Sequence, residues 1–306
     1  MSEKRLTQKL RSELKVKGHS SRTVSVDHLC DLREGIEGNK IRSLLDEQIF
    51  NEYLKSLTFK PNDALLNTQS MIVIAAAQPQ IRLVFTHRGE PHQVIIPPTY
   101  NSDIDKSVLG TLSSILGTEG YHVAKAALPL KLLAVRSGLG KYGRNNICYV
   151  PGMGSFNRLM AFYTDLPCSE EIWTEPQIME RCMSCEACIH GCPAGAIKAD
   201  RFLVHAERCI TFHNERINEF PEWIDPSWHN CLVGCLFCQK VCPENRTFLN
   251  RIEDGDTFSE EETALIMNAT QPDHVPARTA EKLKRIDMLE YCDILGRNLR
   301  VLLNNV

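Results

Sequence analysis

Nine of the thirteen cysteines in this 306-residue chain fall within one block, between Cys182 and Cys242. The first motif of the block reads Cys182-Met-Ser-Cys185-Glu-Ala-Cys188-Ile-His-Gly-Cys192-Pro193. This is the C-x2-C-x2-C-x3-C-P run that ligates [4Fe–4S] clusters, and its fourth cysteine serves the other of two clusters. The short gaps let a tight loop direct three thiolates at one cluster, so the motif predicts iron–sulfur chemistry.

A second motif follows, Cys231-Leu-Val-Gly-Cys235-Leu-Phe-Cys238-Gln-Lys-Val-Cys242-Pro243. Its last three cysteines keep the same spacing, but its first is displaced, because the standard motif would place a cysteine where Leu232 stands. Another residue must supply the missing ligand, and the candidates are Cys209 and Cys231.

Crossing the two motifs gives two sets of ligands. One cluster takes Cys182, Cys185, Cys188 and Cys242, and the other takes Cys192, Cys235, Cys238 and either Cys209 or Cys231. Zinc also suits paired C-x2-C units, but the two C-x3-C-P endings favour clusters. Because every iron would have its thiolate, the clusters would carry electrons, and any chemistry would lie in the part of the chain before Cys182.

The elements that must position this block are mixed, which predicts an α+β fold. Strands are expected at 68–77, 93–97 and 159–164, and helices at 107–119 and 130–137, the latter stopped by Gly138. The tail over 259–306 is polar with recurring Leu and Ile, which predicts two or three surface helices. The expected domains are 1–170, a cysteine-rich module over 171–250, and a helical tail over 251–306 that packs on the main domain.

Composition limits the classes of function. A net charge of −3 argues against a broadly basic nucleic-acid-binding surface, although it allows a local patch. The longest apolar run, 71–77, is too short to span a bilayer, and the N-terminal stretch predicts an exposed amphipathic helix without the apolar centre of a secretory signal. Thirteen cysteines in such a chain indicate reduced thiols or metal ligands, and hence a cytoplasmic protein without a membrane partner.

A glycine-rich segment precedes the cysteines. Gly138, Gly140 and Gly143 satisfy G-x-G-x-x-G, but a predicted helix precedes them and 145–150 reads as extended, so no dinucleotide site is expected. Together with Gly152 and Gly154 they would let a bulky ligand approach the backbone closely. Simple tight turns are the alternative.

The segment 137–156, SGLGKYGRNNICYVPGMGSF, with TDLPC at 164–168 and the two cysteine motifs, resembles the epoxyqueuosine reductases. These belong to a wider group of cobalamin-dependent, double-cluster proteins related to reductive dehalogenases. The resemblance is strongest over 128–244 and extends weakly to 296–303, GRNLRVLL. Where those reductases carry an Asp that donates the proton, this chain has Ala-Ala-Leu-Pro-Leu-Lys at 126–131.

The resemblance implies a nitroreductase-like α/β sandwich at the N-terminus that holds cobalamin, beside a ferredoxin-like double-cluster module. An external low-potential donor of the flavodoxin or ferredoxin type would feed electrons through both clusters to the corrinoid. The substrate would be a tRNA or a small molecule. The family pattern also gives Cys209 as the eighth cluster ligand, which would leave Cys231 spare.

With the family Asp absent, other side chains must be considered as the proton donor. Tyr142 and Lys141 lie beside the glycine turns and are the first candidates, followed by Tyr100 and His122. The expected corrinoid contacts are Gly138, Gly140, Gly143, Tyr100, Gly154 and Ser155. The missing acid favours an alternative function, an electron-transfer or activating protein that delivers low-potential electrons to a partner. A purely structural metal module is a weaker third alternative.

Overall fold

The computed structural model describes residues 1–61, 65, 67–269 and 271–304. The chain forms two compact units, each assembled from several segments. Unit 1 contains Met1–Ala77, Ser102–Glu186 and Asp200–His205, and unit 2 contains Gln78–Asn101, Ala187–Ala199 and Ala206–Val306. These units do not follow the order of the chain, because residues 78–101 join the C-terminal segments.

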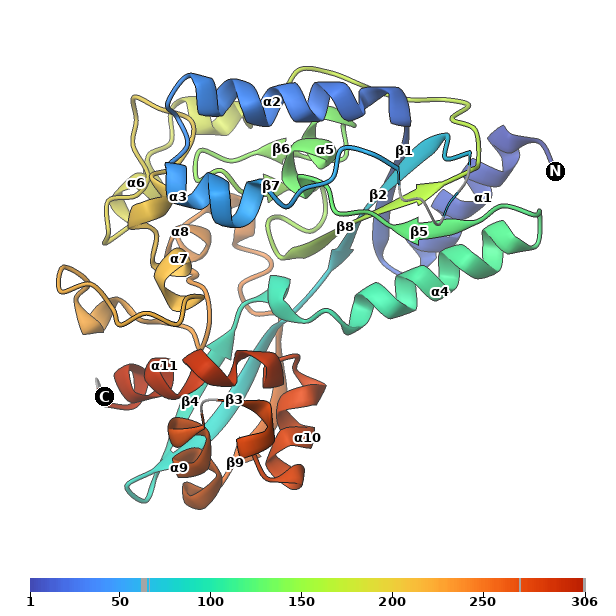
Figure 1. Cartoon of the computed structure of the whole chain (residues 1–306). Coiled ribbons are helices and arrows are strands. Elements are labelled where there is room, and N and C mark those ends of the chain that lie inside the picture. Colours follow the sequence, from blue (N-terminus) through green and yellow to red (C-terminus); the bar gives the residue numbers. More distant parts are fainter. Residues whose placement is uncertain (62–64, 66, 270, 305–306) are drawn as a thin grey trace. The chain divides into compact units, whose positions relative to one another are not determined.

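Unit 1 is built on a four-stranded antiparallel sheet in the order β1-β2-β8-β5 (Figure 1). Its strands are β1 (His19–Ser25), β2 (Ser70–Ala77), β5 (Val123–Lys125) and β8 (Asn157–Thr164), and a separate small hairpin pairs β6 (Lys141–Tyr142) with β7 (Cys148–Tyr149). Its helices are α1 (Glu3–Val16), α2 (Leu29–Ile41), α3 (Glu47–Ile49), α4 (Asp103–Gly117) and α5 (Leu130–Arg136).

Helices cover both faces of this sheet. Strand β2 is buried along most of its length, and its side chains alternate between two hydrophobic cores. Ile72 and Ile74 pack with α1 and α4, whereas Met71 and Val73 pack with α2 and α5. Unit 1 is therefore a helix–sheet–helix sandwich.

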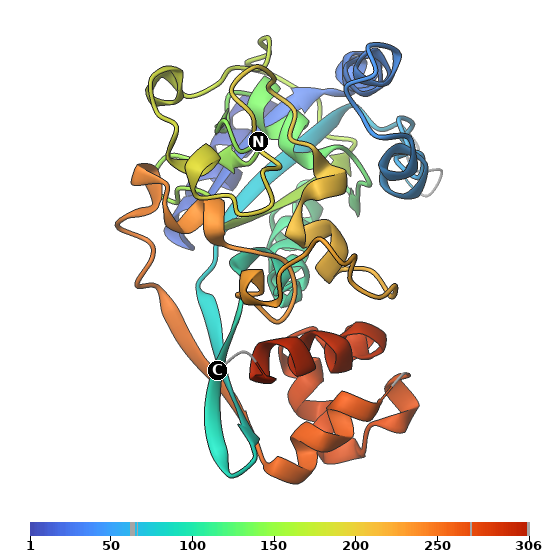
Figure 2. The same ribbon diagram turned by 90° about the vertical axis from the view of Figure 1, so that its left-hand side faces the viewer.

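Unit 2 contains a three-stranded sheet in the order β4-β3-β9, with β3 and β9 parallel. The strands are β3 (Gln80–His87), β4 (Glu90–Ile96) and β9 (Ile252–Phe258). Helices α9 (Glu260–Asn268), α10 (Ala277–Arg285) and α11 (Cys292–Asn304) lie along this sheet (Figure 2). Their buried side chains share its hydrophobic core. Three short helices, α6 (Ala187–His190), α7 (Ile210–Asn214) and α8 (Phe237–Lys240), belong to the cysteine block.

The mixed helix-and-sheet class is confirmed, as are the expected strands near 68–77, 93–97 and 159–164 and the helices near 107–119 and 130–137. Helix α5 ends before Gly138, whose φ of +68° suits glycine. Residues 145–150 were expected to be extended, but only Cys148–Tyr149 forms a strand there. The N-terminal helix is amphipathic as expected, but Leu6, Leu10 and Leu14 are buried under the sheet and not exposed.

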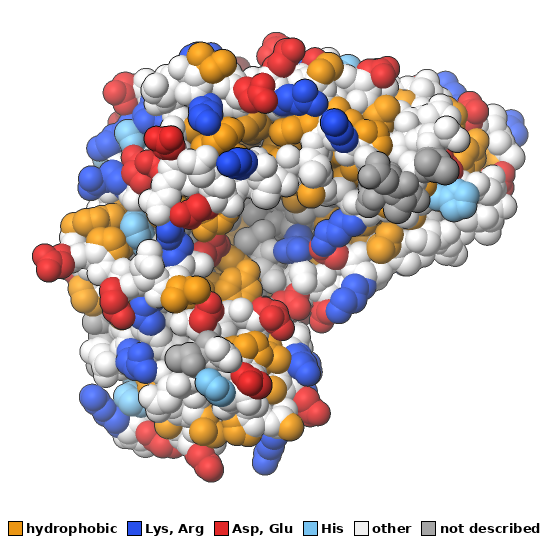
Figure 3. Space-filling model, viewed as in Figure 1, with side chains coloured by type: hydrophobic (Ala, Val, Ile, Leu, Met, Phe, Trp, Pro, Cys, Tyr) orange, Lys and Arg blue, Asp and Glu red, His pale blue; other side chains and the backbone are white. Residues whose placement is uncertain are grey.

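The molecular surface carries both signs of charge. On the face in Figure 3, lysines and arginines are interspersed with aspartates and glutamates. Within the part of the chain that the structure describes, no helix has the length and apolar character needed to cross a bilayer.

Candidate double-cluster site

The ends of the two cysteine motifs lie side by side in unit 2. Helix α6, which contains Cys188, packs against α8, which contains Cys238. Gly191 allows this contact, because a Cβ at this position would lie 2.8 Å from a methyl carbon of Val241. In unit 1, the first cysteine of the block, Cys182, is buried in the turn Glu180–Met183.

Three further thiols of unit 2 share one environment. Burial raises the pKa of Cys235 to about 11, and the neighbouring charges of Cys209 and Cys192 add to the rise. Burial also raises the pKa of Cys209 above its usual range, again with a contribution from Cys192. Cys192, Cys209 and Cys235 are therefore close enough to interact electrostatically, and binding to iron would displace their protons.

Cys231 has different surroundings. Its side chain is completely buried, and its thiol donates a hydrogen bond to Oδ1 of Asn230 at 3.1 Å. Burial raises its pKa, followed by the charge of Cys235.

The structure explains why Leu232 occupies the place of a cysteine. Leu232 is completely buried in the core of unit 2, and its N–H bonds to the carbonyl of Ile95 in β4 at 2.8 Å. The position thus anchors the cysteine segment to the sheet. A ligand is needed from elsewhere because this side chain points into the core.

Gly234, immediately before Cys235, makes room for Tyr100. It has a φ of +68°, and a Cβ there would clash with Oη of Tyr100. The Tyr100 hydroxyl donates a hydrogen bond to Glu215, and burial raises the pKa of both groups. Tyr100 therefore packs under the cysteine segment of unit 2.

Helix α11 ties the segment that carries Cys209 to the one that carries Cys235. Asn298 is completely buried, and its amide donates to the carbonyls of Asn214 at 3.0 Å and Leu232 at 2.8 Å. The amide of Asn214 donates in turn to the carbonyl of Gly234 at 2.8 Å. Sequence reasoning missed this role, although Asn298 lies in the tail segment that carries the weak family resemblance.

Arg297, beside Asn298, strengthens the same connection. Its guanidinium donates to the carbonyls of His213 at 2.9 Å and Asn218. It also lies over the ring of Phe220, 3.9 Å from the centroid. Burial lowers the pKa of Arg297 to about 10, which leaves it charged at neutral pH.

In unit 1, two of the glycines serve the protein's own packing. A Cβ at Gly140 would lie 2.6 Å from the carbonyl oxygen of Tyr149, and one at Gly143 would lie 2.5 Å from its ring. Gly152 is exposed, has a φ of +79° and has open space where a Cβ would stand. The glycine cluster therefore consists of turns that pack on β7, with open backbone at Gly152.

This glycine-rich segment also forms hydrogen bonds with Cys182 and the residues just before it. The N–H of Tyr142 bonds to the carbonyl of Gln177 at 2.8 Å, and the N–H of Met179 bonds back to Tyr142 at 2.8 Å. Arg144 donates to the carbonyl of Cys182 from Nη2 at 2.7 Å and from Nε at 3.2 Å. The segment thus positions the first cysteine, a role that the sequence did not indicate.

The proton-donor candidates differ in accessibility. Tyr142 is 6% exposed, packs edge-on against Phe202, and has a pKa that burial raises above its usual range. Lys141 is exposed. His122 is also exposed, and its backbone N–H and ring bond to Asp165, which orients this turn. Ser155 and Gly154 are buried, and Tyr100 belongs to unit 2.

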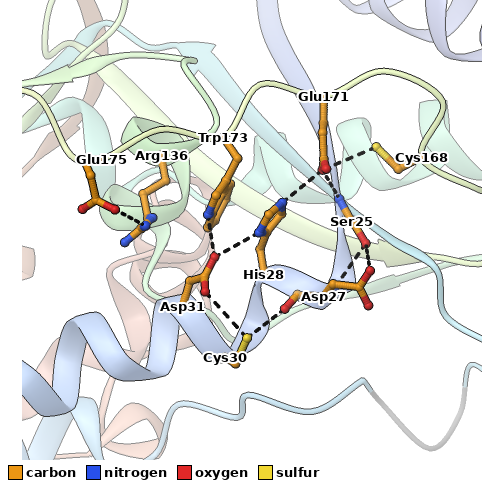
Figure 4. Close-up of polar contacts among 10 residues, drawn as sticks. All are labelled: Ser25, Asp27, His28, Cys30, Asp31, Arg136, Cys168, Glu171, Trp173 and Glu175. Atoms are coloured by element: carbon orange, nitrogen blue, oxygen red, sulfur yellow. Dashed lines mark hydrogen bonds and ion pairs between the residues drawn. The ribbon is translucent and has the colours of Figure 1, made fainter.

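A second polar group in unit 1 fastens the segment after β8 to the start of α2 (Figure 4). His28 stacks on Trp173 with a centroid distance of 4.1 Å. One ring nitrogen of His28 lies 3.0 Å from Asp31 and the other 3.3 Å from Glu171. The Trp173 indole donates to Asp31 at 2.7 Å, so this group stabilises residues 171–173.

Comparison with known proteins supports the cluster assignment. Residues 181–245 match the 4Fe-4S double cluster binding domain, so this part of the chain is a double-cluster domain and the zinc alternative is not retained. The epoxyqueuosine reductase of Cyclobacterium marinum is 34% identical over 161 residues, which are 52% of this chain and 49% of that protein. That of Synechococcus sp. is 33% identical over 141 residues, 45% of this chain and 42% of the relative. The chain spans about half the length of these curated relatives.

Solved structures show the same fold. A crystal structure of epoxyqueuosine reductase with a tRNA-TYR epoxyqueuosine-modified tRNA stem loop aligns with 99% of this chain and 82% of its own, at a TM-score of 0.70 and 19% identity. The Streptococcus thermophilus enzyme covers 98% of this chain and 81% of its own, at a TM-score of 0.68 and 18% identity. The chain therefore resembles the epoxyqueuosine reductases in both sequence and fold.

Proposed function

We propose that this chain is a cobalamin- and iron–sulfur-dependent reductase of the epoxyqueuosine reductase type. The observation that carries the proposal is a double-cluster domain over 181–245 within a chain that has the epoxyqueuosine reductase fold. The nitroreductase-like character of the N-terminal domain, expected over 1–170, is part of the same proposal. The helix–sheet–helix sandwich of unit 1 supports it.

The proposed cluster ligands follow the crossed motifs. One cluster takes Cys182, Cys185, Cys188 and Cys242, and the other takes Cys192, Cys209, Cys235 and Cys238. The family pattern favours Cys209 over Cys231 as the eighth ligand. The hydrogen bond from the Cys231 thiol to Asn230 supports a role for Cys231 as the spare cysteine.

The cobalamin contacts are proposed for unit 1, at Gly138, Gly154 and Ser155, with open backbone at Gly152. Gly140 and Gly143 remain candidates, but their lack of a side chain already serves the packing of Tyr149. A bound corrinoid would supply the strongly reducing cobalt that the protein itself lacks. The chain would supply binding, shielding from water and a proton.

For the proton donor, the structure favours Lys141 over Tyr142. Lys141 is exposed, whereas Tyr142 is buried and holds its proton more tightly than an ordinary tyrosine. The proposed substrate is an epoxyqueuosine-containing tRNA, because a solved relative is bound to such a stem loop. The proposed electron donor is a flavodoxin or ferredoxin, and the proposed compartment is the cytoplasm, where cysteines remain reduced.

Anaerobic purification tests the proposal most directly. Iron and cobalt are quantified per chain after reconstitution with cobalamin, and optical spectra are recorded. We expect about eight irons for two four-iron clusters, a corrinoid spectrum, and turnover of epoxyqueuosine-containing tRNA with a low-potential donor. Iron-loaded protein that takes up no corrinoid would refute the reductase.

The second candidate is an electron-transfer or activating protein. The observation that favours it is the absence of a carboxylate at 126–131, where Ala126 and Leu128 are buried. It predicts two reducible clusters, no turnover by the chain alone, and a stable complex with a redox partner. Single turnover by the purified, reduced chain with the tRNA would exclude it.

A further inference from the structure

Asn230 is the best candidate for a residue that controls one of the clusters without binding iron. It follows Trp228 and His229 in the loop that leads into the second cysteine motif. Its amide Nδ2 lies 3.3 Å from Sγ of Cys235, within range for a hydrogen bond to sulfur. Cys235 is one of the proposed cluster ligands, so the inference rests on the ligand set given above.

The neighbours of Asn230 fix the orientation of its amide. A backbone N–H can only donate, and that of Leu236 points to Oδ1 at 3.0 Å. The Cys231 thiol points to the same oxygen at 3.1 Å. Because both contacts identify the oxygen, the NH2 group must face Cys235 and the carbonyl of Trp228, which lies 3.2 Å away.

The contact affects the charge on sulfur in the expected direction. The N–H of Asn230 directs the positive end of its dipole at Sγ of Cys235, 3.3 Å from Nδ2, and so favours negative charge on the sulfur. A donor that stabilises negative charge on the free thiolate also stabilises it on a thiolate bound to iron. Hydrogen bonds to cluster sulfurs are among the factors that set reduction potentials.

We propose that Asn230 donates an N–H···S hydrogen bond to the cluster ligand Cys235 and raises the reduction potential of that cluster, and that Cys231 orients the amide. Reduction adds one electron from the external low-potential donor to the cluster, with no bond formed or broken. The reduced cluster carries more negative charge, so the N–H dipole stabilises it more than the oxidised form. This gives a function to Cys231, the one cysteine of the block outside the proposed ligand set.

The main test replaces Asn230 and measures both cluster potentials in the full-length, iron-loaded chain by EPR-monitored redox titration. Asn230→Leu removes the donor without adding charge, and the potential shifts by the difference between the strength of this bond to the reduced cluster and to the oxidised one. The equilibrium constant for reduction is expected to fall about tenfold, or about 59 mV for one electron. Asn230→Asp keeps the acceptor for Leu236 and should shift the same potential further in the same direction.

Two cysteine variants examine the orienting role of Cys231. Cys231→Ser keeps an O–H donor to Asn230 and should retain the full iron content and both potentials. Cys231→Ala removes the donor, while the Leu236 N–H still holds the amide oxygen, so a smaller shift of the same sign is expected. The matched control is Asn268→Asp, an exposed asparagine on α9 whose amide bonds to a helix carbonyl, and it should change neither potential.

The outcomes separate this inference from the proposed function. An iron-loaded Asn230 variant with the wild-type potential, or a higher one, would overturn the inference. Loss of a cluster in Cys231→Ser would also overturn it, because Cys231 would then be a ligand. If Asn230→Leu fails to take up iron, Asn230→Asp and Cys231→Ala decide the matter. If the wild-type chain binds no corrinoid while the variants show these shifts in potential, only the proposed reductase function is refuted.

Discussion

Replacing Asn298 with leucine should loosen the two segments that carry Cys209 and Cys235. The amide of Asn298 donates to the carbonyls of Asn214 and Leu232, and its oxygen accepts from Arg297 at 2.9 and 3.1 Å. Leucine has a similar volume but makes none of these bonds. The variant therefore removes the polar connection while it leaves the core filled.

The size of the effect follows from the groups left behind. Two buried carbonyls lose a donor, and each unsatisfied group costs about 1–3 kcal/mol. The carbonyl of Asn214 keeps a long contact of 3.4 Å to Arg297, so the lower half of the range applies there. A total near 3 kcal/mol, divided by about 2 kcal/mol per molar urea, lowers the unfolding midpoint by about 1.5 M.

The assay follows cluster absorbance against urea concentration under anaerobic conditions, together with iron content per chain. We expect the earlier midpoint and preferential loss of one cluster, with iron falling from about eight towards about four per chain. Asn304→Leu is the matched control, since it makes the same substitution on the exposed end of α11 and should stay within about 0.5 kcal/mol. Wild-type midpoint and iron content in Asn298→Leu would refute the connection described here.

Four further substitutions examine other parts of the structure. Asp105→Asn removes the carboxylate that accepts from Arg158 at 2.6 Å and Lys125 at 2.8 Å, and it should lower the free energy of unfolding by about 1.5–3 kcal/mol in urea titrations. Cys209→Ser should lose one cluster, and retention of the full iron content would exclude Cys209 as a ligand. Gly234→Ala should also lose that cluster because of the clash with Tyr100, whereas Gly89→Ala, with a similar φ of +80° but open space, should retain it. His28→Leu should release the segment around Trp173, measured as faster proteolysis at 168–175; unchanged cleavage would contradict the contacts in Figure 4.

The elements that could be predicted from sequence are those with a local signal. Strand β2 is a continuous apolar run, and α4 has Val108, Leu112 and Leu116 on one side. Strand β1, HSSRTVS, was missed because it is polar in sequence although partly buried beside β2. Strand β9, IEDGDTF, was missed because it is an exposed acidic edge strand. In both cases pairing with another strand outweighs the local composition.

In the candidate site, too, features with a local sequence signal could be predicted and contacts between distant residues could not. The double-cluster domain could be predicted because the ligand geometry of a cluster imposes short fixed spacings. The roles of Asn298, Tyr100 and Arg144 could not, because each acts on a partner 38 to 115 residues away in sequence. Bonds from a side chain to a distant backbone carbonyl have no periodicity, so a sequence alone cannot reveal them.

The displaced cysteine of the second motif links these features. Leu232 anchors the segment to the core, and Gly234 lets it pass over Tyr100, so packing within unit 2 holds this stretch of backbone. If Cys209 supplies the missing ligand, as proposed, its segment must be held at a set distance from that of Cys235. Asn298 makes this connection, because it bonds at once to the carbonyl of Leu232 and to that of Asn214. In this chain the departure from ferredoxin spacing is accompanied by a buried polar connection from α11 to both segments.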